Sequence, residues 1–155
     1  MLTNVLLPLV LVGNGLAAGV LVGTLLGAWQ LMAAAPAPQY VRMHAFFATK
    51  FDPFMPICLV GTVVGDALLA ALADHTGSVR ALHALAGLVA LVTVTVSIVK
   101  NVPVNKWMQT LDPDRLPADF NDRDPRRDWG FWNRVRSFLA VAALVANCAA
   151  LAIVL

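Results

Sequence analysis

Two sets of polar side chains lie at helical spacing next to long apolar segments. Asn101 and Asn105 are four residues apart, and Trp129, Asn133 and Arg136 follow one another at i, i+4 and i+7, so that each set shares one face of a helix. Amide and guanidinium groups donate hydrogen bonds and can stabilise an oxygen on which negative charge develops. The two sets together predict a site for a small aromatic or enolate-like ligand.

A titratable group for the same site comes from the polar segment 33–53. His44 shares one face of an amphipathic helix with Phe47 and Phe51, and an imidazole can act as a general base. We expect catalysis by His44, Arg136, Asn101, Asn105 and Asn133, and ligand binding by Arg42, Trp107, Trp129 and Trp132. For the tryptophans the alternative is anchoring at the level of the lipid headgroups.

A second group of polar residues lies inside the apolar segments. Counted at about 1.5 Å per residue, Asp66, Asn14 and Asn147 are roughly 10 to 15 Å from the ends of their segments, and His83 is somewhat shallower. An ionisable group at that depth suggests a functional site, and we expect His83 or Arg80 to be the partner of Asp66. The alternative is a hydrogen-bonded cluster that holds helices together.

Metal and nucleic-acid sites receive little support from the sequence. The chain has three histidines, no glutamate, and no His-x-x-His or Glu-x-x-His spacing, which is the spacing that metal sites in helix bundles use. We predict no metal ligands and no bound cofactor, with a single metal ion held by one histidine and one aspartate as the alternative. The basic residues of segment 100–136 are interleaved with nearly as many aspartates, which argues against a nucleic-acid partner.

The composition predicts the elements that position these groups. Of the 155 residues, 59% are hydrophobic and 13% are charged, and the mean hydropathy is +0.75, whereas a soluble domain carries roughly 25% charge. We expect one all-α domain over residues 1–155, an integral-membrane four-helix up-and-down bundle with a polar cap. Its spans are expected at about 5–32, 54–73, 79–99 and 137–155, joined by connectors 33–53 and 100–136 and by a turn at 74–79.

Two features of the spans predict local geometry. The first span carries four glycines at four-residue spacing, which predicts a face for close packing against another helix; they are Gly15, Gly19, Gly23 and Gly27. Pro103 lies between the two asparagines at the end of the third span. Because proline has no backbone amide to donate, we expect a kink there.

The distribution of positive charge predicts the orientation of the bundle. The two connectors carry ten of the eleven Lys and Arg residues, and the opposite side carries Arg80 alone. Connectors rich in Lys and Arg stay in the cytoplasm. We therefore expect a multi-pass protein of the plasma membrane, with both connectors cytoplasmic and both termini outside.

Four short motifs resemble those of a known family. They are Asn101-Val-Pro-Val-Asn105, Leu111-Asp-Pro-Asp114, Trp129-x-x-Trp132-Asn133-x-x-Arg136 and Phe51-Asp-Pro-Phe-Met-Pro56. In these motifs the sequence resembles the anthrone-oxygenase-like family of small four-helix membrane proteins. The resemblance implies oxygenation of a polyketide anthrone to an anthraquinone in secondary metabolism, with O₂ as co-substrate and without a flavin or haem motif. It points to Asn101, Asn105, Trp132, Asn133 and Arg136 as site residues.

Two classes of function follow. In the first, the protein is a membrane-embedded oxygenase, an oxidoreductase that acts on an aromatic or polyketide-like small molecule with His44 as the base. In the second, it is a non-catalytic membrane subunit or a small-molecule carrier that uses Asp66 and His83. A carrier of four short spans would have to form a homo-oligomer to enclose a path. Both classes have the lipid bilayer as a partner.

Overall fold

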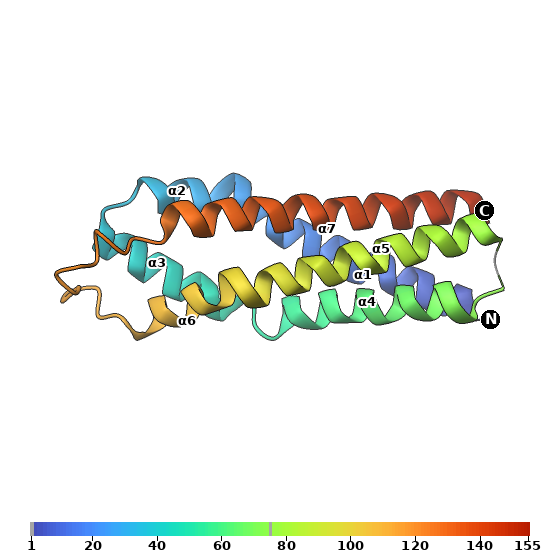
Figure 1. Ribbon diagram of the computed structural model, residues 1–155, viewed down its shortest axis with the longest axis horizontal. Coiled ribbons are helices and arrows are strands. Elements are labelled where there is room, and N and C mark those ends of the chain that lie inside the picture. Colours follow the sequence, from blue (N-terminus) through green and yellow to red (C-terminus); the bar gives the residue numbers. More distant parts are fainter. Residues whose placement is uncertain (1, 75) are drawn as a thin grey trace.

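The protein is a bundle of helices that lie nearly parallel to one long axis (Figure 1). A computed structural model describes residues 2–74 and 76–155, and this part of the chain is helical without strands. The elements are α1 (Leu2–Gly23), η1 (Thr24–Ala28), α2 (Trp29–Ala34), α3 (Ala37–Lys50), α4 (Phe54–Leu72), α5 (Gly77–Val96), η2 (Ser97–Asn101), α6 (Val102–Thr110) and α7 (Arg126–Val154), where η1 and η2 are π-helical turns. The turn expected at 74–79 includes His75, which lies outside the described residues.

Four helical stretches are long and apolar enough to cross a membrane. They are Thr3–Ala34, Phe54–Leu72, Gly77–Thr110 and Arg126–Val154. The chain termini lie at one end of the bundle, and α2, α3, α6 and the loop before α7 lie at the other (Figure 1). The predicted all-α, four-helix membrane bundle is confirmed. The longest stretches continue past the hydrocarbon region, because 32 residues correspond to about 48 Å of helix and the hydrocarbon is about 30 Å thick.

The polar cap is more helical than the connector boundaries suggest. Residues 102–110 form α6, and α7 already begins at Arg126, so that the irregular part of the 100–136 connector is confined to 111–125. The reason is that the Trp129–Arg136 segment continues the helical period of the apolar segment that follows it. The cap residues that carry the predicted chemistry therefore lie on rigid helices.

Two of the four long stretches contain a π-helical turn and a third, α4, begins directly after a short break, and these three interruptions lie at one level along the bundle axis (Figure 1). We call this the break level: it consists of η1, residues 51–53 between α3 and α4, and η2. Pro103 explains η2, since its ring crowds the carbonyl of Val99 and it has no amide to bond there; a wider π-turn accommodates both effects. At η1 the Thr24 hydroxyl donates to the Val20 carbonyl at 2.8 Å, a bond that bends helices.

The prediction of a packing face made of four glycines is wrong. A Cβ atom added at any of these positions would meet no other atom within 4 Å, as is true of Gly15, Gly19, Gly23 and Gly27. Helix α1 instead packs through the face that carries Gly13 and Asn14, and an added Cβ at Gly13 would lie 3.4 Å from the Cys58 carbonyl. Spacing alone identified a small-residue face but not its neighbour.

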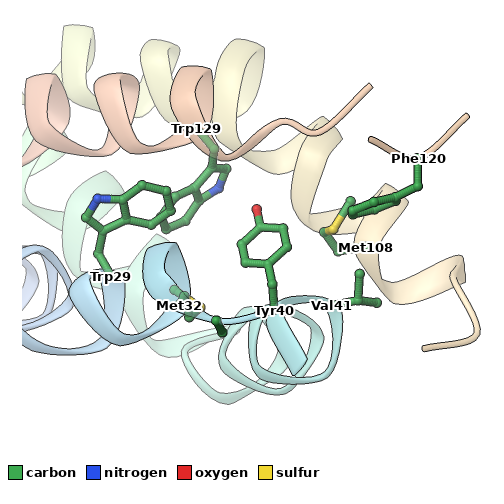
Figure 2. Packing of buried hydrophobic residues seen from close by; sticks show 8 residues of the cluster. Trp29, Met32, Tyr40, Val41, Met108, Phe120 and Trp129 are labelled. Atoms are coloured by element: carbon green, nitrogen blue, oxygen red, sulfur yellow. The ribbon is translucent and has the colours of Figure 1, made fainter. Parts of the chain in front are cut away.

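A compact aromatic core holds the cap together. Figure 2 shows Tyr40 rising from α3 between Trp129 on one side and Met108 with Phe120 on the other. The guanidinium of Arg126 lies over the Tyr40 ring at 4.7 Å and donates to the Ala35 carbonyl at 2.6 Å. This core fixes α3 against α6 and α7, so the side chains that α3 turns toward the bundle have defined positions.

Candidate functional site

A cavity of about 190 Å³ lies at the break level. All three interruptions contribute to its wall, through Thr24 of η1, Asp52 of the α3–α4 break, and Ser97 of η2. Most of the other lining side chains are apolar, among them Val20, Leu21, Met55, Leu59 and Val94. At the cap end the wall is polar and aromatic, with His44, Asn105, Trp129 and Arg136. An apolar cavity with a few converging polar groups is the usual form of a small-molecule site.

Asn105 is the centre of the polar end. Its Oδ1 accepts hydrogen bonds from His44 Nε2 and from Trp129 Nε1, both at 2.9 Å. An indole N–H can only donate, so the atom that faces it must be the amide oxygen, and the nitrogen of His44 that faces the same oxygen must carry a hydrogen. The amide orientation and the histidine tautomer are thus both fixed. With its oxygen occupied, Asn105 has its Nδ2 amide hydrogens to offer to a ligand in the cavity.

The other nitrogen of His44 is also engaged. Nδ1 lies 3.0 Å from the Tyr40 hydroxyl, which donates to it. Burial lowers the pKa of His44, the bond to Asn105 opposes this change, and the charge of Arg136 adds to it. Burial likewise raises the pKa of Tyr40. His44 is therefore a neutral imidazole whose lone pair faces Tyr40, and this geometry does not support its expected role as the base, because the cavity side of the ring is a donor.

Arg136 places a guanidinium in the cavity wall without a compensating carboxylate. Its side chain is 8% exposed, donates from Nε and Nη2 to Asn133 Oδ1 at 3.1 and 2.8 Å, and lies over the Trp129 ring at 5.7 Å. The ion pairs among the described residues involve other side chains. A buried cation is expensive unless it is paired, so a cavity that holds one is suited to a ligand that carries or develops negative charge.

Comparison with known proteins identifies the family of the chain. A family model described as anthrone oxygenase matches residues 43–146. The chain belongs to the anthrone oxygenase family. The matched region contains His44, Asn105, Trp129 and Arg136 and leaves out the α1 and η1 side of the cavity. A search of curated proteins and a search of solved structures found no match.

Two predicted asparagines lie behind the cavity wall. Asn101 donates from Nδ2 to the Trp129 carbonyl at 3.3 Å, and Asn133 accepts from Arg136. Neither side chain is exposed, and Asn101 Oδ1 and Asn133 Nδ2 have no hydrogen-bond partner among the described residues. These two asparagines bond to the Trp129 carbonyl and the Arg136 guanidinium, and they do not line the cavity.

The structure places three predicted ligand-binding residues away from the cavity. Arg42 is exposed and forms an ion pair with Asp114. Trp107 stacks on Phe120 with ring centroids 6.0 Å apart, and Trp132 is covered by the Lys100 ammonium at 5.0 Å. These contacts belong to the surface and to the cap core, in keeping with the headgroup-anchoring alternative for the tryptophans.

Two residues of the site were missed. Asp52 is the one carboxylate among the described residues that line the cavity, and it is exposed at the cavity rim. Tyr40 sets the state of His44 from the preceding helical turn. A signal for Asp52 existed, since it lies in the Phe51-Asp-Pro-Phe motif. For Tyr40 the signal was its i, i+4 spacing to His44.

The second polar group forms a closed cluster deep in the bundle. Asp66 accepts from Asn147 Nδ2 at 3.1 Å, and His83 Nδ1 lies 3.1 Å from Asp66 Oδ1. Asn14 joins through its Oδ1, 3.4 Å from Asn147 Nδ2, and donates to the Ala140 carbonyl at 3.1 Å. All four side chains are 0% exposed, and one comes from each of α1, α4, α5 and α7. Arg80, the other expected partner, instead donates to the Ala70 and Ala71 carbonyls at the end of α4.

No set of three His, Cys or Asp side chains among residues 2–74 and 76–155 is arranged to hold a metal ion. The buried histidine and aspartate that do meet, His83 and Asp66, are hydrogen-bonded to each other. The four side chains of this cluster do not line the cavity at the break level. The titratable and charged side chains that line the cavity are instead His44, Asp52 and Arg136.

Proposed function

We propose that this protein is a membrane-embedded oxygenase that converts a planar phenolic ketone of the anthrone type to the corresponding quinone. The proposal is supported by the family and, most directly, by the guanidinium of Arg136, which forms no ion pair among the described residues, in the wall of a mostly apolar cavity. Removal of a proton from the carbon opposite the ketone of an anthrone gives an enolate. A site for that enolate requires donors directed at one oxygen and a flat apolar space for the rings.

The donors in this proposal are Arg136 and the Nδ2 group of Asn105. His44 and Trp129 both donate hydrogen bonds to Asn105 Oδ1, and these bonds fix the orientation of the amide. The amide therefore does not have to rotate when negative charge develops on the ligand. His44 is thus a positioning residue. This assignment replaces the base role that its residue type suggested.

In this proposal the carboxylate of Asp52 at the cavity rim is the base that removes this proton from the substrate. The C–H bond breaks, the proton moves to Asp52, and the electron pair is delocalised onto the ketone oxygen held by Arg136 and Asn105. The resulting carbanion supplies the electrons that reduce O₂ as a C–O bond forms. Loss of the second proton from the same carbon and cleavage of the O–O bond give the new carbonyl and water. The substrate loses two hydrogens and gains one oxygen atom, and O₂ supplies both the product oxygen and the water oxygen.

The proposal includes an orientation. The cap end of the bundle carries ten of the eleven basic residues, and the positive-inside rule then favours a cytoplasmic cap in a plasma-membrane protein. In that orientation the polar end of the cavity lies on the cytoplasmic side of the membrane. Addition of a glycosylation acceptor to either terminus tests this arrangement, because only a terminus on the outer side of the membrane would be modified in a eukaryotic host.

The test of the activity compares Arg136→Met with Arg134→Met in purified protein reconstituted in lipid nanodiscs. Arg134 is exposed on the same helix two residues earlier, so it controls for loss of a charge. Conversion of anthrone under ¹⁸O₂ is followed by mass spectrometry, with empty nanodiscs as the autoxidation blank. Loss of an oxyanion donor lowers kcat by about 10²- to 10³-fold, and we expect this for Arg136→Met and no change for Arg134→Met. An unchanged rate in Arg136→Met, or wild-type conversion no faster than the blank, would contradict the proposal.

A further inference from the structure

The cavity opens along a seam between two helices. Side chains that line the cavity and are also well exposed mark its rim, and these are Asp52, Pro56, Val60 and Ile98. Val60 is 49% exposed on α4 and Ile98 is 60% exposed on η2. Helix α4 packs against α5, which continues into η2. Three of the four rim residues are therefore apolar and lie on the two sides of one seam.

The seam faces lipid for most of its length. Val60 is six residues inside α4, about 9 Å from the end of that helix, and α4 has about the length needed to cross the hydrocarbon. The exposed side chains around it are apolar, among them Ile57 and Val64 on α4 and Val99 on η2. Only Asp52, at the end of the seam next to the cap, is a charged rim residue.

The irregular backbone explains why the seam is open there. Residues 97–101 form a π-turn, which widens the helix and interrupts its regular row of side chains. On the other side, α4 begins at Phe54, so the regular packing of α4 on α5 stops near Pro56. The two helices part at the level where Ser97 turns its buried side chain to the cavity. A π-turn at this position is typical of a functional site.

The cavity is smaller than a ligand with three fused rings. An apolar cavity of about 150 Å³ binds one benzene molecule. A volume of about 190 Å³ is thus too small to enclose three fused rings. A ligand of that size whose oxygen reaches Arg136 must extend into the seam, where its remaining surface meets the apolar rim and the acyl chains.

We propose that the seam between Val60 and Ile98 is a lateral portal through which an apolar, planar aromatic substrate enters the cavity from the bilayer. The proposal rests on the proposed function for the identity of the substrate, and its geometry can be tested without turnover. Lipid-soluble molecules concentrate in the hydrocarbon, and the portal lies at that depth. The exposed end of the cavity at Asp52 would serve for the proton.

The experiment measures how fast a thiol inside the cavity is modified. Ser97 is buried in the cavity wall, and Ser97→Cys is introduced after the native Cys58 and Cys148, both free thiols, are replaced by Ala. The protein in nanodiscs is treated with N-phenylmaleimide, an uncharged reagent with a single benzene ring on its maleimide, or with a sulfonated, membrane-impermeant maleimide. Portal variants are Val60→Trp, Ile98→Trp and both together. Controls are Val64→Trp and Leu88→Trp, which are 52% and 58% exposed on the same helices and do not line the cavity.

We expect N-phenylmaleimide to modify the thiol at least tenfold more slowly in the double portal variant, with the controls unchanged and the sulfonated reagent slow throughout. Equal rates in portal and control variants would overturn the proposal, as would faster modification by the sulfonated reagent, which would indicate an aqueous entrance. Thermal unfolding of each variant, followed by circular dichroism, identifies any that is misfolded, and for those Val60→Phe and Ile98→Phe are used. Because the labelling requires no turnover, its failure is distinguishable from failure of the ¹⁸O₂ assay, which tests the proposed function.

Discussion

The two buried polar groups of this protein are built from similar side chains and differ in how they are satisfied. In the deep cluster, Asp66, His83, Asn14 and Asn147 bond to one another across four helices, and a carboxylate meets an imidazole. In the cavity wall, Arg136 forms no ion pair with a carboxylate of the described residues, and the hydrogen bonds to the Asn105 side chain that hold it in place engage its oxygen. The difference teaches that burial of polar groups in a membrane bundle is not by itself a sign of chemistry. Polar side chains that bond to one another hold helices together. A buried charge that has no ion-pair partner and lies beside a cavity is suited to binding a ligand.

Removal of the carboxylate from the deep cluster is the strongest test of this comparison. Breaking a buried pair by removing one partner costs about 3–5 kcal/mol, and we expect Asp66→Ala to lower the free energy of unfolding by this amount. Denaturation in mixed detergent micelles measures it. The rate of anthrone conversion per folded molecule should stay within about twofold of wild type, because Asp66 does not line the cavity. A stable variant without activity would instead place the chemistry in the deep cluster and support the carrier or subunit alternatives.

A smaller effect is expected at a contact that supports the cavity from behind. A Cβ atom at Gly130 would lie 2.2 Å from the Trp29 ring, which packs on Trp129 at 5.3 Å. Overpacking of this kind costs about 1–3 kcal/mol, and Gly130→Ala should also displace Trp129 from Asn105. Gly61→Ala, where an added Cβ meets nothing within 4 Å, is the matched control. Loss of stability together with a lower kcat is the expected result; an unaltered melting temperature would show that Trp29 is not held as the structure indicates.

The smallest effect concerns His44 and pH. Burial lowers the pKa of His44 below its ordinary value of 6.5, so the unfolded chain binds a proton more readily, and stability should fall as the pH is lowered below about 6.5. Gln at position 44 keeps a donor for Asn105 and does not titrate, so His44→Gln should remove this acid destabilisation. Its effect on kcat should be no more than about tenfold, the value of one hydrogen bond.

The same variant separates the positioning role from the base role. If His44 were the base, His44→Gln would abolish turnover and Asp52→Asn would not. We expect the reverse: Asp52→Asn should lower kcat by about 10²- to 10⁴-fold, the range for a general base. Both are measured as pH–rate profiles in nanodiscs, and Thr49→Val, an exposed position of the same segment, is the control.

The helices and the polar cap were predictable from sequence because apolar length and charge placement are local properties. The shared face of Trp129, Asn133 and Arg136 was predictable for the same reason, since helical spacing fixes which side chains of one helix lie together. Which helix packs against a given face is not a local property of the sequence. The meeting of His44 with Asn105, 61 residues apart, depends on the packing of α3 on α6. The glycines of α1 were misassigned because their spacing identified a face but not the helix that would pack against it.

Asp52 shows a different limit. It lies in a short break between two helices, where no period exists to predict a direction. Its position at the cavity rim results from the way α3 and α4 are joined, which the sequence indicates only as a turn. Residues in such breaks have to be located by structure.

The alignment of the three interruptions has one more consequence. Of the four described helical stretches, α7 alone crosses the break level as an unbroken α-helix. Among the described residues it is therefore the one regular helix that joins the cap to the stem, which is the part of the bundle on the other side of the break level. Sequence changes in α2, α3 and α6 can reshape the ligand end without disturbing the hydrogen-bond ladders of the stem. The architecture therefore has two parts, a membrane-embedded stem and a cap, and a change in the straightness of α7 would move one relative to the other.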